Sequence, residues 1–193
     1  PHDQSSAASD VYKRQIRKYH IDNDADGFIS FIESFYNENK FNMPSPYVQR
    51  IPQLPPWMVP VYSDLLENFI EDIKLSKTHV AVITSAVLNV LEKGESMNRC
   101  HTLPSHYTAT HYVSENPEQS DLFYHPAKTL LEAFNPDSDE WATAAGLYIN
   151  QGDVILHPSY IECSTPPQDK KRMTITLTVT LQRADERSRD TSK

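Results

Sequence analysis

The sequence predicts a mainly β fold, an antiparallel sandwich or jelly roll, preceded by a small N-terminal helix–loop–helix unit. Three observations lead to this prediction. Short runs rich in β-branched and aromatic residues recur after Lys77 and are separated by turn-prone stretches. Only one amphipathic helix accompanies these runs, and no internal repeat divides the chain. The length of 193 residues suits one domain with a small appendage.

The composition excludes several classes of function. The 18 basic and 26 acidic residues give a net charge of −8 without any basic run, so we expect no nucleic acid and no membrane as partner. No apolar run reaches the ~18 residues of a membrane span, and no signal peptide is visible. We therefore expect a soluble protein, cytoplasmic or virion-associated rather than secreted. The two cysteines, Cys100 and Cys163, exclude a disulfide-rich scaffold and a four-cysteine zinc site.

The N-terminal part of the chain is predicted to hold three segments before the jelly roll. Residues 1–10 resemble a sequencing or assembly scar, and we expect them to be disordered and outside the fold. Residues 11–42 are predicted to form two short helices around an acidic loop, because apolar side chains recur at helical spacing on both sides of it. Residues 43–60 carry six prolines, which exclude a helix interior or a central strand, so this stretch is predicted to be an extended linker.

The jelly-roll domain is predicted over residues 61–182 and opens with a helix. Ser63 caps this helix, which runs to about Leu75 and buries one apolar stripe. The strands that follow are expected in the runs THVAVIT, AVLNVLEKG, HYTATHYV, DLFYHP, GLYIN, DVILHPS and RMTITLTVTL. Residues 183–193 are mixed in charge with almost no apolar side chain, so we expect a disordered tail.

Residues 22–33 read DNDADGFISFIE and carry oxygen ligands at the spacing that Ca²⁺ requires. The ligand positions are held by Asp22, Asp24, Asp26, the backbone carbonyl of Phe28, Ser30 (directly or through water) and Glu33. Gly27 stands where such a loop must turn with a positive φ. The segment is similar to an EF-hand, and this resemblance implies a bound Ca²⁺; a solvated acidic turn is the alternative. No second loop of this kind is found in the sequence, so we expect a weak, unpaired site.

A second resemblance covers about half of the chain, from Lys93 to Gln182. It is carried by the segments KGESMNRCHTLPSHYTATHYV, DLFYHP and QGDVILHPSYIECSTPPQDKKRMTITLTV. These segments resemble the double-stranded β-helix of Fe(II)/2-oxoglutarate oxygenases, nearest to their prolyl-hydroxylase-like branch. The resemblance implies an iron site of two histidines and one carboxylate, with open positions for 2-oxoglutarate and O₂. It also implies an arginine that holds the far carboxylate of 2-oxoglutarate.

In the first of these segments two alignments with the iron ligands stay open. An ungapped alignment on Tyr112 places the first ligand at Cys100 and the carboxylate at Thr102. An alignment on the proline of the preceding turn places these two ligands at His101 and Leu103 instead. Neither alignment supplies an acidic ligand.

In the last segment, the position of the distal histidine lies four residues after Ser159 and falls on Cys163. Arg172 is retained, and the resemblance implies that it binds the carboxylate of 2-oxoglutarate. The first and the distal ligand of this fold reach one metal ion. Under the alignment on the tyrosine, Cys100 and Cys163 should therefore face each other inside the barrel mouth.

Other histidines are not predicted to replace the missing ligands. Along the strand HYTATHYV, the two-residue period places His106 on the face of Thr108 and Thr110, and His111 on the opposite face. A neutral histidine on a strand is usually packed or hydrogen-bonded rather than a metal ligand.

Two functions are compatible with these observations. The first is a calcium-binding EF-hand protein whose oxygenase-like jelly roll is non-catalytic and serves as a structural or interaction module in a protein assembly such as a virion. No catalytic residue is assigned under this hypothesis. The alternative is a 2-oxoglutarate/Fe(II)-dependent hydroxylase with an atypical metal site, which the EF-hand regulates or stabilises. Turnover of 2-oxoglutarate to succinate distinguishes the two.

Overall fold

The computed structural model describes residues 15–22, 27–40, 46–100, 102, 104–114, 121–124 and 144–184. Its helices and strands are β1 (Arg17–His20), α3 (Phe28–Asn39), β2 (Tyr47–Ile51), α4 (Met58–Asp72), β3 (His79–Leu91), β4 (Met97–Cys100), β5 (Tyr107–Tyr112), β6 (Leu122–Tyr124), β7 (Ala144–Gly146), β8 (Asp153–Pro158), β9 (Cys163–Thr165) and β10 (Arg172–Arg183). Among these elements no helix is long and apolar enough to cross a membrane.

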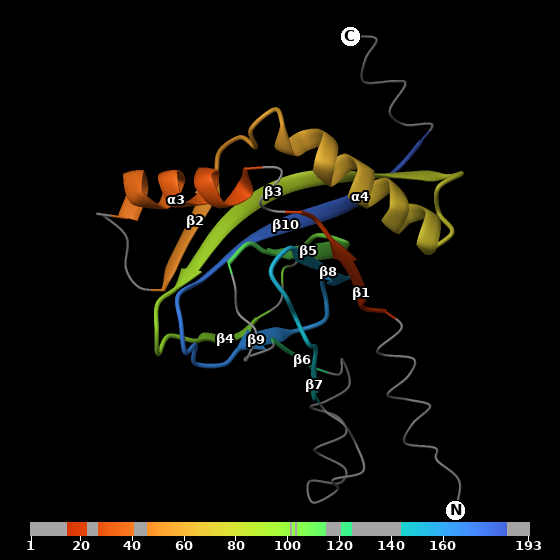
Figure 1. Ribbon diagram of the computed structural model, residues 1–193. Coiled ribbons are helices and arrows are strands. Elements are labelled where there is room, and N and C mark those ends of the chain that lie inside the picture. The colour runs from red at the N-terminus through yellow and green to blue at the C-terminus, as the bar shows by residue number, and fades with distance from the viewer. Residues whose placement is uncertain are drawn as a thin grey trace, which may run out of the picture.

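Two antiparallel sheets form the body of the molecule. The larger sheet has six strands in the order β1-β8-β5-β10-β3-β2, and the smaller has four in the order β4-β9-β6-β7. Figure 1 shows α3 and α4 on the outer face of the large sheet, with the small sheet on its other side. The predicted mainly β, jelly-roll class is confirmed, with two helices in the part of the chain that the structure describes.

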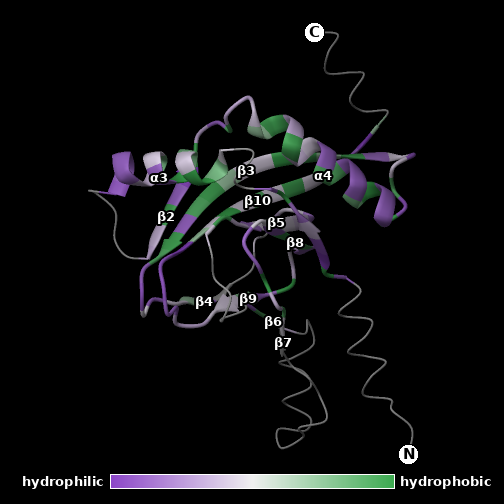
Figure 2. Ribbon diagram, viewed as in Figure 1, coloured by the Kyte–Doolittle hydropathy of each residue, from purple (hydrophilic) through white to green (hydrophobic). Residues whose placement is uncertain are grey.

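An apolar core lies between the outer face of the large sheet and the two helices α3 and α4. The predicted stripe of α4 is buried there, with Leu65, Leu66 and Phe69 at most 6% exposed. Figure 2 shows hydrophobic residues alternating with hydrophilic ones along this helix, as an amphipathic helix requires. The helix begins at Met58 rather than at Ser63, because the proline that follows lies in the first turn, where no intrahelical donor is lost.

The predicted first helix of the helix–loop–helix unit is wrong. Residues Arg17–His20 form β1, which pairs with β8 at the edge of the large sheet. Their burial alternates along the strand, so the side chains follow a two-residue period instead of a helical one. Only the second helix of the unit, α3, is formed, and its Phe28 and Ile32 pack into the core under the helices.

The predicted linker contains a strand. Tyr47–Ile51 forms β2, which pairs with β3 and ends the large sheet on the side opposite to β1. An edge strand tolerates prolines at its ends because it donates backbone hydrogen bonds on one side only, and this strand lies between Pro46 and Pro52. The predicted run GLYIN also differs, since β7 ends at its first residue.

Candidate functional site in the interior between the sheets

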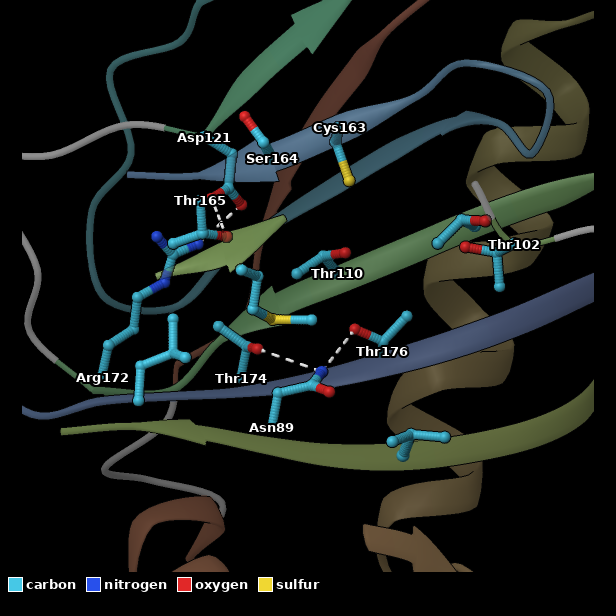
Figure 3. Close-up of a pocket in the computed structure, with 14 residues that line it drawn as sticks. Asn89, Thr102, Thr110, Asp121, Cys163, Ser164, Thr165, Arg172, Thr174 and Thr176 are labelled. Atoms are coloured by element: carbon cyan, nitrogen blue, oxygen red, sulfur yellow. Dashed lines mark hydrogen bonds and ion pairs between the residues drawn. The ribbon is translucent and has the colours of Figure 1, made fainter. Parts of the chain in front are cut away.

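A cavity of about 250 Å³ lies between the two sheets. Strands of both sheets contribute side chains to it, and Figure 3 shows those of Asn89, Thr102, Thr110, Asp121, Cys163, Ser164, Thr165, Arg172, Thr174 and Thr176 around it. The charged residues gather at one end of this group, and Thr102 lies at the other end.

Hydroxyl groups line most of the cavity wall on the large sheet. They are present because alternate residues of β5 and β10 are threonines, which suit the inward positions of a strand in both shape and β-propensity. Asn89 Nδ2 donates to Thr176 Oγ1 at 2.9 Å and to Thr174 Oγ1 at 3.5 Å. This wall is therefore polar but uncharged.

The charged end of the cavity is a buried ion pair between Arg172 and Asp121. Nη2 of Arg172 donates to Oδ2 of Asp121 at 2.6 Å, and the two side chains are only 4% and 7% exposed. The hydroxyl of Tyr112 donates to the same carboxylate oxygen. Thr165 Oγ1 donates to the other oxygen, Oδ1, at 2.7 Å. Both oxygens of the carboxylate are thus used within the protein.

Burial and charge keep these donors protonated. Burial raises the pKa of the Tyr112 hydroxyl well above its ordinary value, and the charge of Asp121 raises it further. Burial lowers the pKa of Arg172, but the adjacent carboxylate of Asp121 raises it, and the net direction is upward. The guanidinium also lies 4.8 Å from the ring centroid of Tyr112. The donors therefore stay in the form that binds an anion.

The two buried histidines lie on opposite faces of the large sheet. The ring centroids of His157 and Phe123 are 5.2 Å apart, and burial lowers the pKa of His157 to about 4. Nδ1 of His111 and the hydroxyl of Tyr62 share a hydrogen bond of 2.9 Å, and the ring centroids of His111 and Phe28 are 4.8 Å apart. Burial lowers the pKa of His111 to about 3. Phe28 and Tyr62 belong to the helices, whereas Thr108 and Thr110 line the cavity, so His111 lies on the face opposite to these threonines, as predicted. The structure does not bring the two imidazoles together as a metal site.

The backbone positions of the two cysteines lie opposite each other, as the alignment on the tyrosine predicts. Cys100 of β4 and Cys163 of β9 are directly opposite in the antiparallel ladder of the small sheet. Opposite residues of such a ladder have Cα atoms ~4.5–5.5 Å apart. This register supports the alignment that places these residues at the first and distal ligand positions, while His101 and Leu103 of the other alignment lie outside the described residues.

The described residues do not fit the iron site that the resemblance implies. Ferrous iron in such a site is held by two imidazoles and a carboxylate. Among its described lining residues, the cavity offers the hydroxyl of Thr102 and the thiol of Cys163 at the aligned positions. The carboxylate of Asp121, the one carboxylate among these residues, is ion-paired with Arg172. Nowhere in the described ranges do three or more His, Cys, Asp or Glu side chains form a group that could hold a metal ion.

The acidic loop is only partly described. Asp24 and Asp26 lie outside the described residues, and Asp22 is exposed beyond the end of β1. Gly27 has a φ of +73°, as predicted for its position. The helix α3 begins already at Phe28, whose carbonyl thereby enters the helical hydrogen-bond ladder instead of facing a loop. Of the predicted ligands the structure places Ser30 and Glu33 as exposed side chains, both on this helix.

Asp121 was not among the candidate residues predicted from the sequence. Its position at the head of the run DLFYHP is a weak signal, because an acidic residue at a strand end is usually solvated. Its partner Arg172 is 51 residues further along the chain, and only the fold brings the two side chains together.

Comparisons with known proteins give the fold. No protein-family model matches the sequence, and no curated protein matches it either. Solved structures do match, among them a prolyl hydroxylase from Trichoplax adhaerens in complex with a hypoxia inducible factor peptide fragment (11% identity, 98% of this chain, 92% of that one, TM-score 0.61). An oxidoreductase of the 2OG-Fe(II) oxygenase family from Burkholderia pseudomallei matches at 12% identity over 93% of this chain and 91% of its own (TM-score 0.59). HygX from Streptomyces hygroscopicus, with nickel and 2-oxoglutarate bound, matches at 11% identity over 90% and 86% of the two chains (TM-score 0.56). The chain therefore has the fold of the 2OG-Fe(II) oxygenases.

Proposed function

We propose that this chain is a binding or structural module built on the oxygenase fold, without iron-dependent hydroxylase activity. The observation that carries the proposal is the chemistry at the aligned ligand positions, a hydroxyl at Thr102 and a thiol at Cys163. A threonine hydroxyl stays protonated and neutral, so it does not replace the carboxylate of a ferrous site. Since the module would not hydroxylate a substrate, we propose that it binds a protein partner or forms part of a larger assembly.

A turnover assay tests this proposal. The full chain is incubated with Fe(II), ascorbate and 2-oxoglutarate, and succinate is measured against buffer. We expect no succinate above the buffer rate, because Thr102 and Cys163 stand at aligned ligand positions and no metal-holding group is found among the described residues. The matched variant is Arg172→Ala: succinate formed by the wild type and lost in this variant would contradict the proposal.

The second candidate function is a 2-oxoglutarate/Fe(II)-dependent oxygenase with an atypical metal site. Two observations favour it. The matching structures include one with nickel and 2-oxoglutarate bound, and Arg172 lies on β10 beside the cavity, as the resemblance implies. The turnover assay decides between the two candidates, since Arg172-dependent succinate is the result that this candidate requires.

We further propose that the acidic side chains of residues 22–33 bind Ca²⁺, without the carbonyl of Phe28, which α3 uses in its own hydrogen bonds. The proposal rests on the ligand spacing of the sequence and on the left-handed backbone of Gly27. Titration calorimetry should show one site with a Kd of ~10⁻⁵ to 10⁻³ M, which Glu33→Gln abolishes. The control is Glu38→Gln, because Glu38 lies on the same helix outside the loop and bonds to Ser34. Equal heats for wild type and Glu33→Gln would exclude this site.

A further inference from the structure

The structure assigns a carboxylate receptor to Arg172, Tyr112 and Thr165, and we infer that Asp121 is its built-in ligand. The receptor contacts only the carboxylate group and not the rest of the molecule that carries it. While Asp121 is present, free carboxylates, 2-oxoglutarate included, are kept out. When Asp121 is shortened, a small free carboxylate takes its place. This inference rests on the proposed function and deepens it. Because the carboxylate of Asp121 already occupies the three donors, they are not available to the carboxylate of 2-oxoglutarate.

The receptor is made of donors only. A guanidinium and two hydroxyls converge on the two oxygens of one carboxylate, with measured donor–acceptor distances of 2.6 Å for Arg172 and 2.7 Å for Thr165. Charge-assisted bonds of this kind are the strongest that neutral or cationic side chains make with an anion. Asp121 is the acceptor for all three donors.

The donors are held independently of the acceptor. Tyr112 is the last residue of β5, Thr165 the last of β9 and Arg172 the first of β10, and each is paired in a ladder, with Thr174, Met97 and Leu91 respectively. Asp121 comes from outside these ladders, immediately before the three-residue strand β6. Shortening Asp121 therefore removes the acceptor and leaves the donors in place.

The receptor also has unused donor capacity. Nη1 of Arg172 is buried and has no hydrogen-bond partner among the described residues, and the side chain as a whole is 4% exposed. A buried guanidinium without a counter-ion is strongly unfavourable, so an empty receptor has a large affinity for any anion that fits. Among the described residues that line the cavity, none besides Asp121 carries a carboxylate that could take over this role.

The cavity supplies the room for a free anion. In Figure 3 the Asp121–Arg172 pair closes one end of it, and the remainder extends past Thr110 and Cys163 toward Thr102. A volume of about 250 Å³ beside the receptor accommodates an anion of the size of formate or acetate. The site is therefore both built for a carboxylate and reachable from within the cavity.

Chemical rescue tests the inference. We expect Asp121→Ala to lower Tm, and sodium formate at about ten times its Kd to raise the Tm of this variant again by about 3–6 °C. Sodium chloride of equal ionic strength should not do so, and neither should formate in the double variant Asp121→Ala/Arg172→Met. The matched control is Asp153→Ala: this carboxylate is also buried, but its partner Lys18 is 43% exposed, so formate should not restore its Tm.

Two results would overturn the inference. One is a folded Asp121→Ala whose Tm responds to formate no more than to chloride. If that variant does not fold, Asp121→Ser also shortens the side chain but keeps a polar group beside the donors, and it must show the formate response. The other is calorimetric binding of 2-oxoglutarate to the wild type that is lost in Arg172→Met. Binding of 2-oxoglutarate without succinate formation in the turnover assay would contradict this inference alone. Binding with succinate formation would contradict the proposed function as well.

Discussion

Acid should unfold this protein through its two buried histidines. Burial holds the pKa of His111 at about 3 and that of His157 at about 4, against an ordinary value of 6.5. Below pH 6.5 the unfolded chain therefore binds protons that the folded protein does not, so stability is complete above this pH and is lost as the pH falls toward the folded values. One pH unit corresponds to ~1.4 kcal/mol for each group. At pH 5 each histidine thus removes about 2 kcal/mol, and both together about 4 kcal/mol.

The loss is measured by urea unfolding at pH 7.5 and pH 5.0. Other groups also contribute to the acid sensitivity of the wild type, so the comparison is made with His111→Gln and His157→Gln. Each variant should lose about 2 kcal/mol less than the wild type between the two pH values, even though it is less stable at pH 7.5. The double variant should lose about 4 kcal/mol less, because the histidines lie on opposite faces of the sheet and contribute independently.

A pH-dependent loss that is the same in the wild type and in both variants would refute this reasoning. It would mean that the imidazoles are protonated in the folded protein as readily as in the unfolded chain. The contacts with Phe28 and Phe123, which exclude water from the two rings, would then have to be absent in solution.

Two further predictions concern the backbone and the thiols. Gly152→Ala should reduce the free energy of unfolding by more than about 2 kcal/mol, because Gly152 has a φ of +84° and a Cβ there would overlap the backbone carbonyl oxygen of Ile21. Gly94→Ala is the control in the same urea experiment: its φ is +85° but no atom lies within 4 Å of the added Cβ, so it should cost about half as much. Mild oxidation should link Cys100 to Cys163, since the two are opposite in one ladder, and a non-reducing peptide map should show the link in the wild type and not in Cys163→Ser.

The sequence predicted the fold class because the periodic segments are long. The strand β10 has 12 residues and the helix α4 has 15, enough for the two-residue and the helical period to be distinguished. Arg17–His20 is too short for this distinction, and Ile16 and Tyr19 suit a helix as well as a strand. The prolines around Tyr47–Ile51 predict a linker from the sequence, although an edge strand accommodates them.

The candidate site was predictable only where a motif fixed the spacing. The opposite placement of Cys100 and Cys163 followed from the alignment with the oxygenase motif, and the register of the small sheet agrees with it. The pairing of Asp121 with Arg172 left no trace in the sequence, because contact between distant residues is set by the packing of two sheets and not by a local period. The residue that fills the site was therefore found only in the structure.

The position of β10 in the large sheet determines when the sheet can assemble. Although it is the last strand in the described part of the chain, β10 lies in the middle of the sheet, between β5 and β3, and β1 pairs with the distant β8. Contacts of such high sequence separation make folding slow, in the range of milliseconds to seconds. During synthesis, one edge of β3 and one edge of β5 stay unpaired until β10 has been completed at residue 183. Unpaired edges of this kind aggregate readily, so the edges of β3 and β5 are the places where the incomplete chain is most exposed to aggregation.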